Sequence, residues 1–238
     1  MNTNNELNLA NVLNKRVIYD ITPFTLLDYP HKTACILWFT GCNMRCSYCY
    51  NPDIVFGKGK KTIGEALQFI QSRIGLLDGV VLSGGECTLH KQVFELAIEL
   101  KKMGLLVKID TNGSNPIFLE KLIQNNLVDF ISLDFKALPN KFQAITQSNL
   151  FSAFEASLLL FQQYKIPFEI RTTVHTNLLN VEDIQAMIAY LEKMEYKGIF
   201  YIQNYLNNVK TIGNLANTSN KITENIFSKT NIPIQIRN

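Results

Sequence analysis

Residues 33–49 read TACILWFTGCNMRCSYC, an apolar run that leads directly into a loop with three cysteines. The run Thr33–Phe39 predicts a strand that is buried on both faces, as strands of parallel sheets usually are. The polar residues that follow it place Cys42, Cys46 and Cys49 just beyond the carboxyl end of that strand. The stretch therefore predicts a sulfur-rich site carried by a parallel sheet.

Similar apolar runs recur along the chain and alternate with helical patterns. Further strands are predicted at Gly79–Leu82, Leu105–Asp110, Val128–Asp134, Pro167–Thr173 and Gly198–Gln203. Among the helices between them, one begins with a capping box of Thr62 and Glu65, and another begins at Asn180. Six strand–helix units in series predict an α/β fold with right-handed crossovers. Periodicity alone fits both an open doubly wound sheet and a barrel.

Composition and charge narrow the class of protein. The chain has 238 residues, of which 47% are hydrophobic and 18% charged, as in ordinary globular proteins. Its net charge of +3 is too small to indicate binding to nucleic acid or to an acidic membrane. The first residues, 1–14, lack the basic start and apolar core that a signal peptide would have, and no apolar run approaches the roughly 20 residues that span a bilayer. We expect a cytoplasmic protein with a loose tail over residues 1–15 and a single domain over 16–238, its core at about 33–204.

The three clustered cysteines indicate a metal centre. In a reducing cytosol, clustered cysteines favour a metal or catalytic role over disulfides. A structural zinc site and a saturated cubane cluster each need four ligands. With only three, a four-iron cluster keeps one iron open to chelate the amine and carboxylate of an amino acid. A zinc knuckle completed by a distant Cys or His stays open as an alternative on spacing alone.

The Cys-x3-Cys-x2-Cys spacing, with Tyr48 before the last cysteine, resembles the signature of the radical S-adenosylmethionine (SAM) superfamily. The segments 25–30 (TLLDYP), 39–43 (FTGCN) and 49–52 (CYNP) resemble the activating proteins of glycyl-radical enzymes, especially those of anaerobic ribonucleoside-triphosphate reductase. The resemblance implies an incomplete (β/α)6 barrel with parallel strands. It also implies a [4Fe-4S] cluster on Cys42, Cys46 and Cys49, with SAM as the second cofactor.

In barrels, chemistry lies on the loops after the carboxyl ends of the strands, and the polar motifs of this chain fall there. The resemblance implies a set of residues that bind SAM: Tyr48, Gly84, Gly85, Glu86, Asp110, Thr111, Asn112, Asp134, Lys136 and Arg171. No side chain is assigned a catalytic role, because the cofactors supply the radical chemistry while the protein positions them.

Each of these motifs also has a purely structural interpretation. Gly84-Gly85-Glu86 fits a strand-to-helix turn with Glu86 in the first helical turn. Asn112 and Gly113 form a common turn pair, and Asp134 with Lys136 fits a structural ion pair at a strand end.

Two positions depart from the family pattern. Cys87 occupies the position where family members often have proline. It fits a small neutral residue at the start of a helix, or a redox-active thiol whose pKa is lowered by the helix start. Tyr50 replaces a histidine that often follows the last cysteine.

The implied reaction is reductive cleavage of SAM to a 5′-deoxyadenosyl radical, which takes hydrogen from a glycine of a partner enzyme. The resemblance favours an anaerobic ribonucleoside-triphosphate reductase as that partner, and flavodoxin or ferredoxin as the low-potential electron donor. One alternative is a radical enzyme that acts on a small molecule, like 7-carboxy-7-deazaguanine synthase. Those proteins usually have Asp-Thr where this chain has Tyr50-Asn51. The other alternative is a metal-binding module without catalysis.

Overall fold

The computed structural model describes residues 11–223, 227 and 230–237. The chain forms two compact units. The first contains Met1–Cys42, Asp53–Thr111 and Ile117–Ile131, and the second contains Asn43–Pro52, Asn112–Pro116 and Ser132–Asn238. Most of the expected tail, residues 1–10, lies outside the described residues, whereas residues 11–13 are helical.

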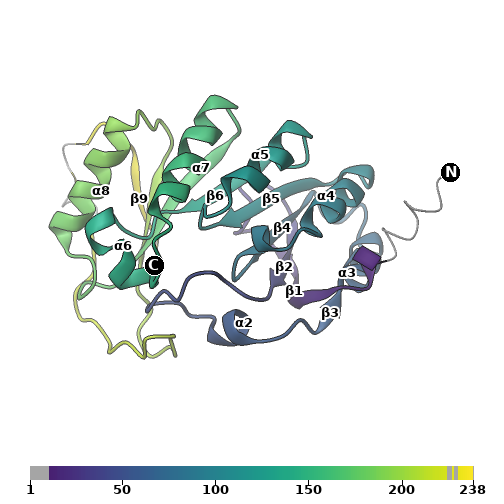
Figure 1. Ribbon diagram of the computed structural model, residues 1–238, viewed down its shortest axis with the longest axis horizontal. Helices are drawn as coiled ribbons and strands as arrows, with labels where there is room; N and C mark the ends of the chain where they lie inside the picture. The colour runs from purple at the N-terminus through teal and green to yellow at the C-terminus, as the bar shows by residue number, and fades with distance from the viewer. Residues whose placement is uncertain (1–10, 224–226, 228–229, 238) are drawn as a thin grey trace. The chain divides into compact units, whose positions relative to one another are not determined.

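In the first unit the strand order is β3-β1-β2-β4-β5 (Figure 1). The bounds are Arg16–Thr25 for β1, Ala34–Phe39 for β2, Lys61–Thr62 for β3, Gly79–Gly84 for β4 and Leu106–Thr111 for β5. Strands β2, β4 and β5 are parallel neighbours, as their continuous apolar runs predict. Strand β1 pairs antiparallel with β2 and with β3. It was not predicted, because most of its residues are exposed or only half-buried and lack a continuous apolar run.

Helices α3 (Ile63–Gln71) and α4 (Val93–Lys102) of the first unit turn their apolar residues inward. The predicted capping box is confirmed, because Thr62 accepts from the amide of Glu65 while Glu65 accepts from the amide of Thr62. A short 3-10 helix, η1 (Cys87–Leu89), follows β4, and α5 (Pro116–Gln124) follows β5. Helix α2 (Pro52–Phe56) follows the cysteine loop.

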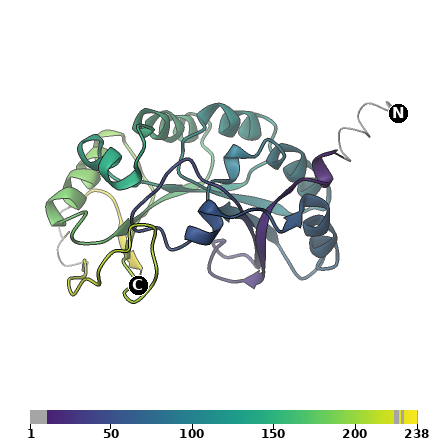
Figure 2. The same cartoon turned by 60° about the horizontal axis from the view of Figure 1, so that its bottom comes forward.

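In the second unit β7 (Phe168–Val174), β8 (Phe200–Asn204) and β9 (Ile234–Arg237) are parallel, in that order. Its helices are α6 (Pro139–Thr146), α7 (Phe151–Gln163) and α8 (Val181–Lys193) (Figure 2). Asn180 caps α8, as predicted, and the structure adds Asp183 as the second member of a capping box. The last strand of the sheet is β9, as the sequence also predicts a short strand at the end of the chain. The irregular stretch near the end of the sequence also predicts a helix at Lys221–Ser228, of which residues 224–226 and 228 lie outside the described ones.

Aromatic packing forms much of the core of the second unit. Phe135 stacks on Phe154 with ring centroids 4.8 Å apart, and Tyr190 and Phe200 pack around the same ring. Phe135 directly follows β6 (Phe130–Asp134), the strand that begins in the first unit and ends in the second. The core thus holds fixed the backbone from which Asp134 and Lys136 project.

The predicted α/β class with mostly parallel strands is confirmed. The sheet ends at β3 and at β9, each of which has a single neighbour, so it is open and not a closed barrel. An open sheet agrees with the incomplete barrel expected from the resemblance. In the described part of the chain, no helix combines the length and the apolar character that crossing a membrane requires.

Candidate functional site

The three cysteines after β2 are divided between the two units. Cys42 ends a segment of the first unit, whereas Cys46 and Cys49 belong to the second, where Cys46 is buried. All three are free thiols. Within the described ranges, no three His, Cys, Asp or Glu side chains are gathered as metal ligands. The proposal that the three cysteines bind a metal therefore rests on their positions in the sequence and on the chemistry of their thiols.

Helix α6 holds the part of the cysteine loop that lies in the second unit. The amide of Arg45 donates to the carbonyl of Thr146 at 2.8 Å, and the amide of Ser47 donates to the carbonyl of Ile145 at 3.1 Å. The last carbonyls of a helix have no partner within the helix, so the loop supplies donors that they need. This helix was not among the sequence predictions, since its apolar face is short and Pro139 opens it.

Asn112 supports the same loop through a ring of hydrogen bonds. The side-chain nitrogen Nδ2 of Asn112 donates to Oδ1 of Asn43 at 3.0 Å, and Nδ2 of Asn43 donates to Oγ of Ser114 at 2.8 Å. The amide of Ser114 closes the ring by donating to Oδ1 of Asn112 at 2.9 Å. Asn112, predicted to bind SAM, thus joins the loop after β5 to the start of the cysteine loop. The sequence carried no signal for the participation of Asn43 and Ser114.

The Gly84-Gly85 pair is required by close backbone packing in the first unit. Gly84 has a φ of +124°, and a Cβ there would lie 2.3 Å from the carbonyl oxygen of Phe39. A Cβ on Gly85 would lie 1.9 Å from the carbonyl oxygen of Gly41 and 3.3 Å from Cβ of Cys42. The amides of Gly85 and Glu86 donate to the carbonyls of Phe39 and Gly41, both at 2.9 Å. The turn is thereby fixed against the residue that precedes Cys42.

Glu86 and Thr111 meet in a buried network. One carboxylate oxygen of Glu86 accepts from Oγ1 of Thr111 at 2.9 Å, from Oγ1 of Thr88 at 2.6 Å and from the amide of Thr88 at 3.1 Å. Glu86 is 1% exposed and caps η1, which matches the structural interpretation of this motif. A carboxylate with three donors on one oxygen keeps a fixed orientation.

Asp110 lies in a second buried group in the first unit. Its Oδ1 accepts from the ammonium of Lys108, and its Oδ2 accepts from Oγ of Ser83 at 3.1 Å. Lys108 is almost fully buried, so its charge needs this partner. The sequence interpretation missed Lys108 because the residue lies between apolar Val107 and Ile109 in the middle of a strand.

Cys87 is fully buried at the start of η1. Its thiol contacts the carbonyls of Leu82 at 3.5 Å and Asp110 at 3.6 Å. Burial, followed by the charges of Glu86 and Asp110, raises the pKa of Cys87 well above its usual value. The interpretation that the helix start lowers the pKa of Cys87 is therefore wrong, because burial and the two neighbouring carboxylates raise it. Cys87 is a small neutral residue at a helix entry.

Asp134, Lys136 and Arg171 form one charged cluster in the second unit. Nε of Arg171 donates to Oδ1 of Asp134 at 2.6 Å, and Nζ of Lys136 donates to Oδ2 at 3.0 Å. Burial alone would raise the pKa of Asp134, but the charges and hydrogen bonds of Arg171 and Lys136 outweigh it and lower the pKa to about 2. Two cations on one carboxylate leave the cluster with a net positive charge.

Tyr48 lies beside this cluster. Nζ of Lys136 is 5.8 Å from the centroid of its ring. Its side chain is buried, and among the described residues its hydroxyl finds no hydrogen-bond partner. A buried hydroxyl without a partner is costly, so a group that can hydrogen-bond to it would stabilise this site.

The thiol of Cys46 fits a metal ligand in its chemistry. Burial raises its pKa, with Lys136 opposing that effect. A coordinating metal deprotonates a thiol outright, so a bound metal would compensate for the burial of this thiolate. The residues present thus suit an iron–sulfur centre.

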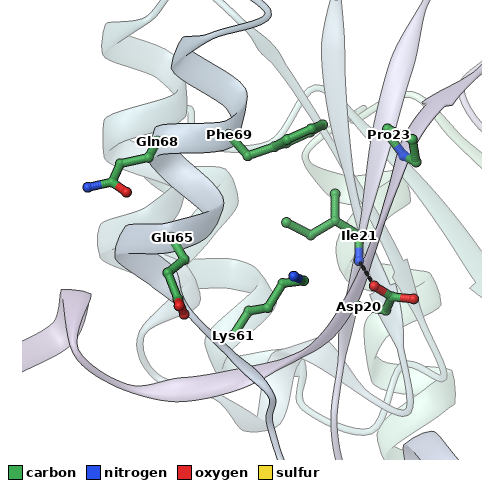
Figure 3. A pocket seen from close by; sticks show the side chains of 7 residues that line it. All are labelled: Asp20, Ile21, Pro23, Lys61, Glu65, Gln68 and Phe69. Atoms are coloured by element: carbon green, nitrogen blue, oxygen red, sulfur yellow. Dashed lines mark hydrogen bonds between the residues drawn. The ribbon is translucent and has the colours of Figure 1, made fainter.

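A pocket of about 540 Å³ in the first unit lies apart from these residues. Figure 3 shows its lining by Asp20, Ile21, Pro23, Lys61, Glu65, Gln68 and Phe69. Its two carboxylates already have partners, because Asp20 accepts from the amide of Ile21 at 2.8 Å and Glu65 caps α3. None of the predicted site residues lines it.

Comparison with known proteins shows which family this is. A family model described as the radical SAM superfamily matches residues 36–198. The chain belongs to the radical SAM superfamily. A protein of Methanocaldococcus jannaschii, named as a glycyl-radical enzyme activating enzyme, is 32% identical to this radical SAM chain over 179 residues, which are 72% of this chain and 73% of that protein. The pyruvate formate-lyase-activating enzyme of Clostridium pasteurianum is 32% identical over 126 residues, or 50% and 52% of the two chains.

Solved structures support the fold. SuiB of Streptococcus suis, solved with S-adenosylmethionine, superposes with a TM-score of 0.63 at 13% identity, covering 85% of this chain and 52% of that one. This radical SAM chain spans about half the length of that SuiB protein and of the solved anSMEcpe protein with bound AdoMet. Radical SAM proteins are enzymes that use SAM and an iron–sulfur cluster, so the family match establishes an enzyme.

Proposed function

We propose that this radical SAM enzyme activates a glycyl-radical enzyme by removing a hydrogen atom from a glycine of its partner. The observation that carries the proposal is the similarity to the M. jannaschii protein of that name, which extends over about three quarters of both chains. The motif segments 25–30, 39–43 and 49–52 agree with it.

In this proposal Cys42, Cys46 and Cys49 hold a [4Fe-4S] cluster. The three-ligand set leaves one iron open for SAM, in the way that a catalytic zinc keeps an open position. When bound, the reduced cluster supplies the electron that splits SAM to methionine and a 5′-deoxyadenosyl radical. The contacts of Arg45 and Ser47 with the end of α6 fix the loop that carries two of these ligands.

The buried networks of the first unit would orient SAM. The protonated amine of methionine is a hydrogen-bond donor and needs acceptors. The backbone amides of Gly85 and Glu86 are donors themselves, and they already bond to the carbonyls of Phe39 and Gly41. Binding of the methionine amine would therefore fall to the carbonyl oxygens of this motif and to the carboxylate of Glu86. Thr111 orients that carboxylate, and Asp110 borders the same turn through Ser83.

The charged cluster of the second unit suits the methionine carboxylate. Lys136 and Arg171 bring two cationic hydrogen-bond donors to one place, and charged donors of this kind bind carboxylates strongly. Asn112 would act mainly by holding the cysteine loop through Asn43, and Tyr48 offers its ring and a hydroxyl to the adenosyl group.

For the partner we propose an anaerobic ribonucleoside-triphosphate reductase, with a flavodoxin or ferredoxin as electron donor. The resemblance of the motif segments favours this reductase, whereas the relatives reported above name glycyl-radical enzymes in general and pyruvate formate-lyase. The two partner classes are separated by experiment.

The test is electron spin resonance of the candidate partner after anaerobic incubation with this enzyme, SAM and a reductant. We expect the doublet of a glycyl radical on the reductase, and its loss when the target glycine is replaced by alanine. A doublet on pyruvate formate-lyase alone would reassign the partner. Cleavage of SAM with no radical on either protein would contradict activation and favour a small-molecule substrate.

A further inference from the structure

Residues 205–218, which we term the closing loop, follow β8 and are drawn in yellow-green in Figure 2. The loop has no helix or strand, yet it is tightly cross-bonded. Asn208 and Asn217 exchange two hydrogen bonds of 2.8 and 2.7 Å, and Asn207 and Thr218 exchange two of 2.8 and 3.0 Å. The loop is thus built to keep one conformation.

Two residues after β7 fasten the base of the closing loop. A ring nitrogen of His175 lies 2.9 Å from the carbonyl oxygen of Ala216, and the hydroxyls of Thr176 and Thr218 are 2.5 Å apart. His175 is buried and stands edge-on to the ring of Tyr205, with centroids 4.6 Å apart. This histidine therefore serves as an anchor of the loop.

The closing loop bonds directly to the cysteine loop at three points. The amide of Gly213 donates to the carbonyl of Ser47 at 2.8 Å, and the amide of Ile212 donates to the carbonyl of Cys49 at 3.1 Å. The amide of Leu206 donates to the hydroxyl of Tyr50 at 2.7 Å. The backbone around two cysteines is thereby held from one side by α6 and again by the closing loop.

Gly213 allows the closest of these approaches. A Cβ at this position would lie 2.7 Å from Cβ of Ser47 and 2.9 Å from its carbonyl oxygen. These distances are too short for any side chain, and the obstacle includes backbone that cannot turn away. Any residue larger than glycine must therefore move the closing loop off the cysteine loop.

We propose that the closing loop is a latch that fixes the backbone of the cysteine loop so that its cysteines can bind a metal, with Gly213 and Tyr50 as positioning residues. The inference rests on the proposed role of the three cysteines as cluster ligands. Groups around a metal site that fix its ligands typically change metal affinity by about 10- to 100-fold when mutated. Tyr50, the residue after the last cysteine, contacts the closing loop twice. Its hydroxyl accepts from the amide of Leu206, and its ring packs on the ring of Tyr205 with centroids 5.5 Å apart.

The experiment compares cluster retention and backbone protection in four variants. Gly213→Ala pushes the latch away, and Tyr50→Phe removes one bond while keeping the ring. Gly64→Ala, in α3 of the first unit, is the matched glycine control, since its nearest atom is 3.3 Å from the added Cβ. Tyr201→Phe in β8 is the matched tyrosine control. Circular dichroism establishes that each variant is folded before it is used.

After anaerobic reconstitution, iron loss to an excess of chelator is followed in each variant. We expect loss about 10-fold faster in Gly213→Ala, a smaller acceleration in Tyr50→Phe, and rates within about twofold of wild type in both controls. Hydrogen exchange of the metal-free proteins provides a second measurement. It should show faster exchange of the amides of Leu206, Ile212 and Gly213 in the two latch variants only.

The outcomes separate the latch from the function. If wild type assembles a cluster and Gly213→Ala retains iron as wild type does, the latch is overturned while the proposed function stands. If wild type assembles no cluster, both are overturned.

Discussion

Arg171 places its Nε 2.6 Å from Oδ1 of Asp134, while Lys136 binds the other oxygen of the same carboxylate at 3.0 Å. Both partners of the arginine pair are largely buried, with 18% and 23% of their side chains exposed. Arg171→Gln should lower the free energy of unfolding by about 2 kcal/mol, because a buried carboxylate would lose one of its two cations. Urea denaturation of the metal-free protein measures this.

The matched control for that variant is Lys102→Gln. Lys102 pairs with Glu99 at 2.8 Å, but its side chain is 66% exposed. Solvent screening limits such a pair to a small fraction of a kcal/mol, so we expect a change below about 0.5 kcal/mol. Equal losses in the two variants would contradict the structural role of Arg171.

The ion pair of Asp134 and Arg171 also predicts that the stability of the folded chain depends on pH. The pKa of Asp134 is lowered to about 2 in the folded chain, against about 4 when unfolded. A lowered pKa contributes stability that is present above the unfolded pKa and is lost as the pH falls toward the folded pKa. The difference in unfolding free energy between wild type and Arg171→Gln should therefore be constant near neutral pH and shrink between about pH 4 and about pH 2. A difference that stays constant over this range would argue against the shift.

Gly85 offers a test of the turn that precedes Glu86. Gly85→Ala would bring a Cβ to 1.9 Å from the carbonyl oxygen of Gly41, so the turn must open. We expect a loss of several kcal/mol, seen as a fall in the thermal midpoint of roughly 10 °C or more. Gly64→Ala is again the control. A thermal midpoint of Gly85→Ala within a few degrees of wild type would contradict a close contact between Gly85 and the backbone of Gly41.

The five cysteines should differ in reactivity. Cys35 and Cys87 are fully buried, and burial raises the pKa of both, that of Cys35 to about 12. In metal-free protein, N-ethylmaleimide should modify Cys42 and Cys49 first, because they are half-buried, and should reach Cys35 and Cys87 only on unfolding. Peptide mass spectrometry follows the order. Rapid labelling of Cys87 would restore the case for a reactive thiol.

The parallel strands and several helices could be predicted from the sequence because their signals are local. The apolar run of β2, the capping box at Thr62 and the cap residue Asn180 are each signals that lie within a few residues. Strand β1 escaped prediction because it pairs antiparallel and leaves much of its surface to solvent. Whether these residues form a strand depends on pairing with a neighbouring strand more than on their own composition.

The candidate site was predictable as a set of motifs but not as a set of contacts. The spacing of the cysteines and the polar residues at the carboxyl ends of β4, β5 and β6 could be predicted directly. Lys108, Asn43 and the closing loop could not, since each acts through a partner distant in sequence. Gly213 is an example, because an isolated glycine in a polar segment predicts only a turn.

The central claim is that Cys42, Cys46 and Cys49 hold a cluster that cleaves SAM. The most direct measurement is iron content after anaerobic reconstitution together with release of 5′-deoxyadenosine on addition of SAM and dithionite, for wild type and Cys46→Ser. We predict about four irons per chain and 5′-deoxyadenosine from wild type, and loss of both in the variant. Bound zinc without 5′-deoxyadenosine, or equal turnover in Cys46→Ser, would contradict the claim.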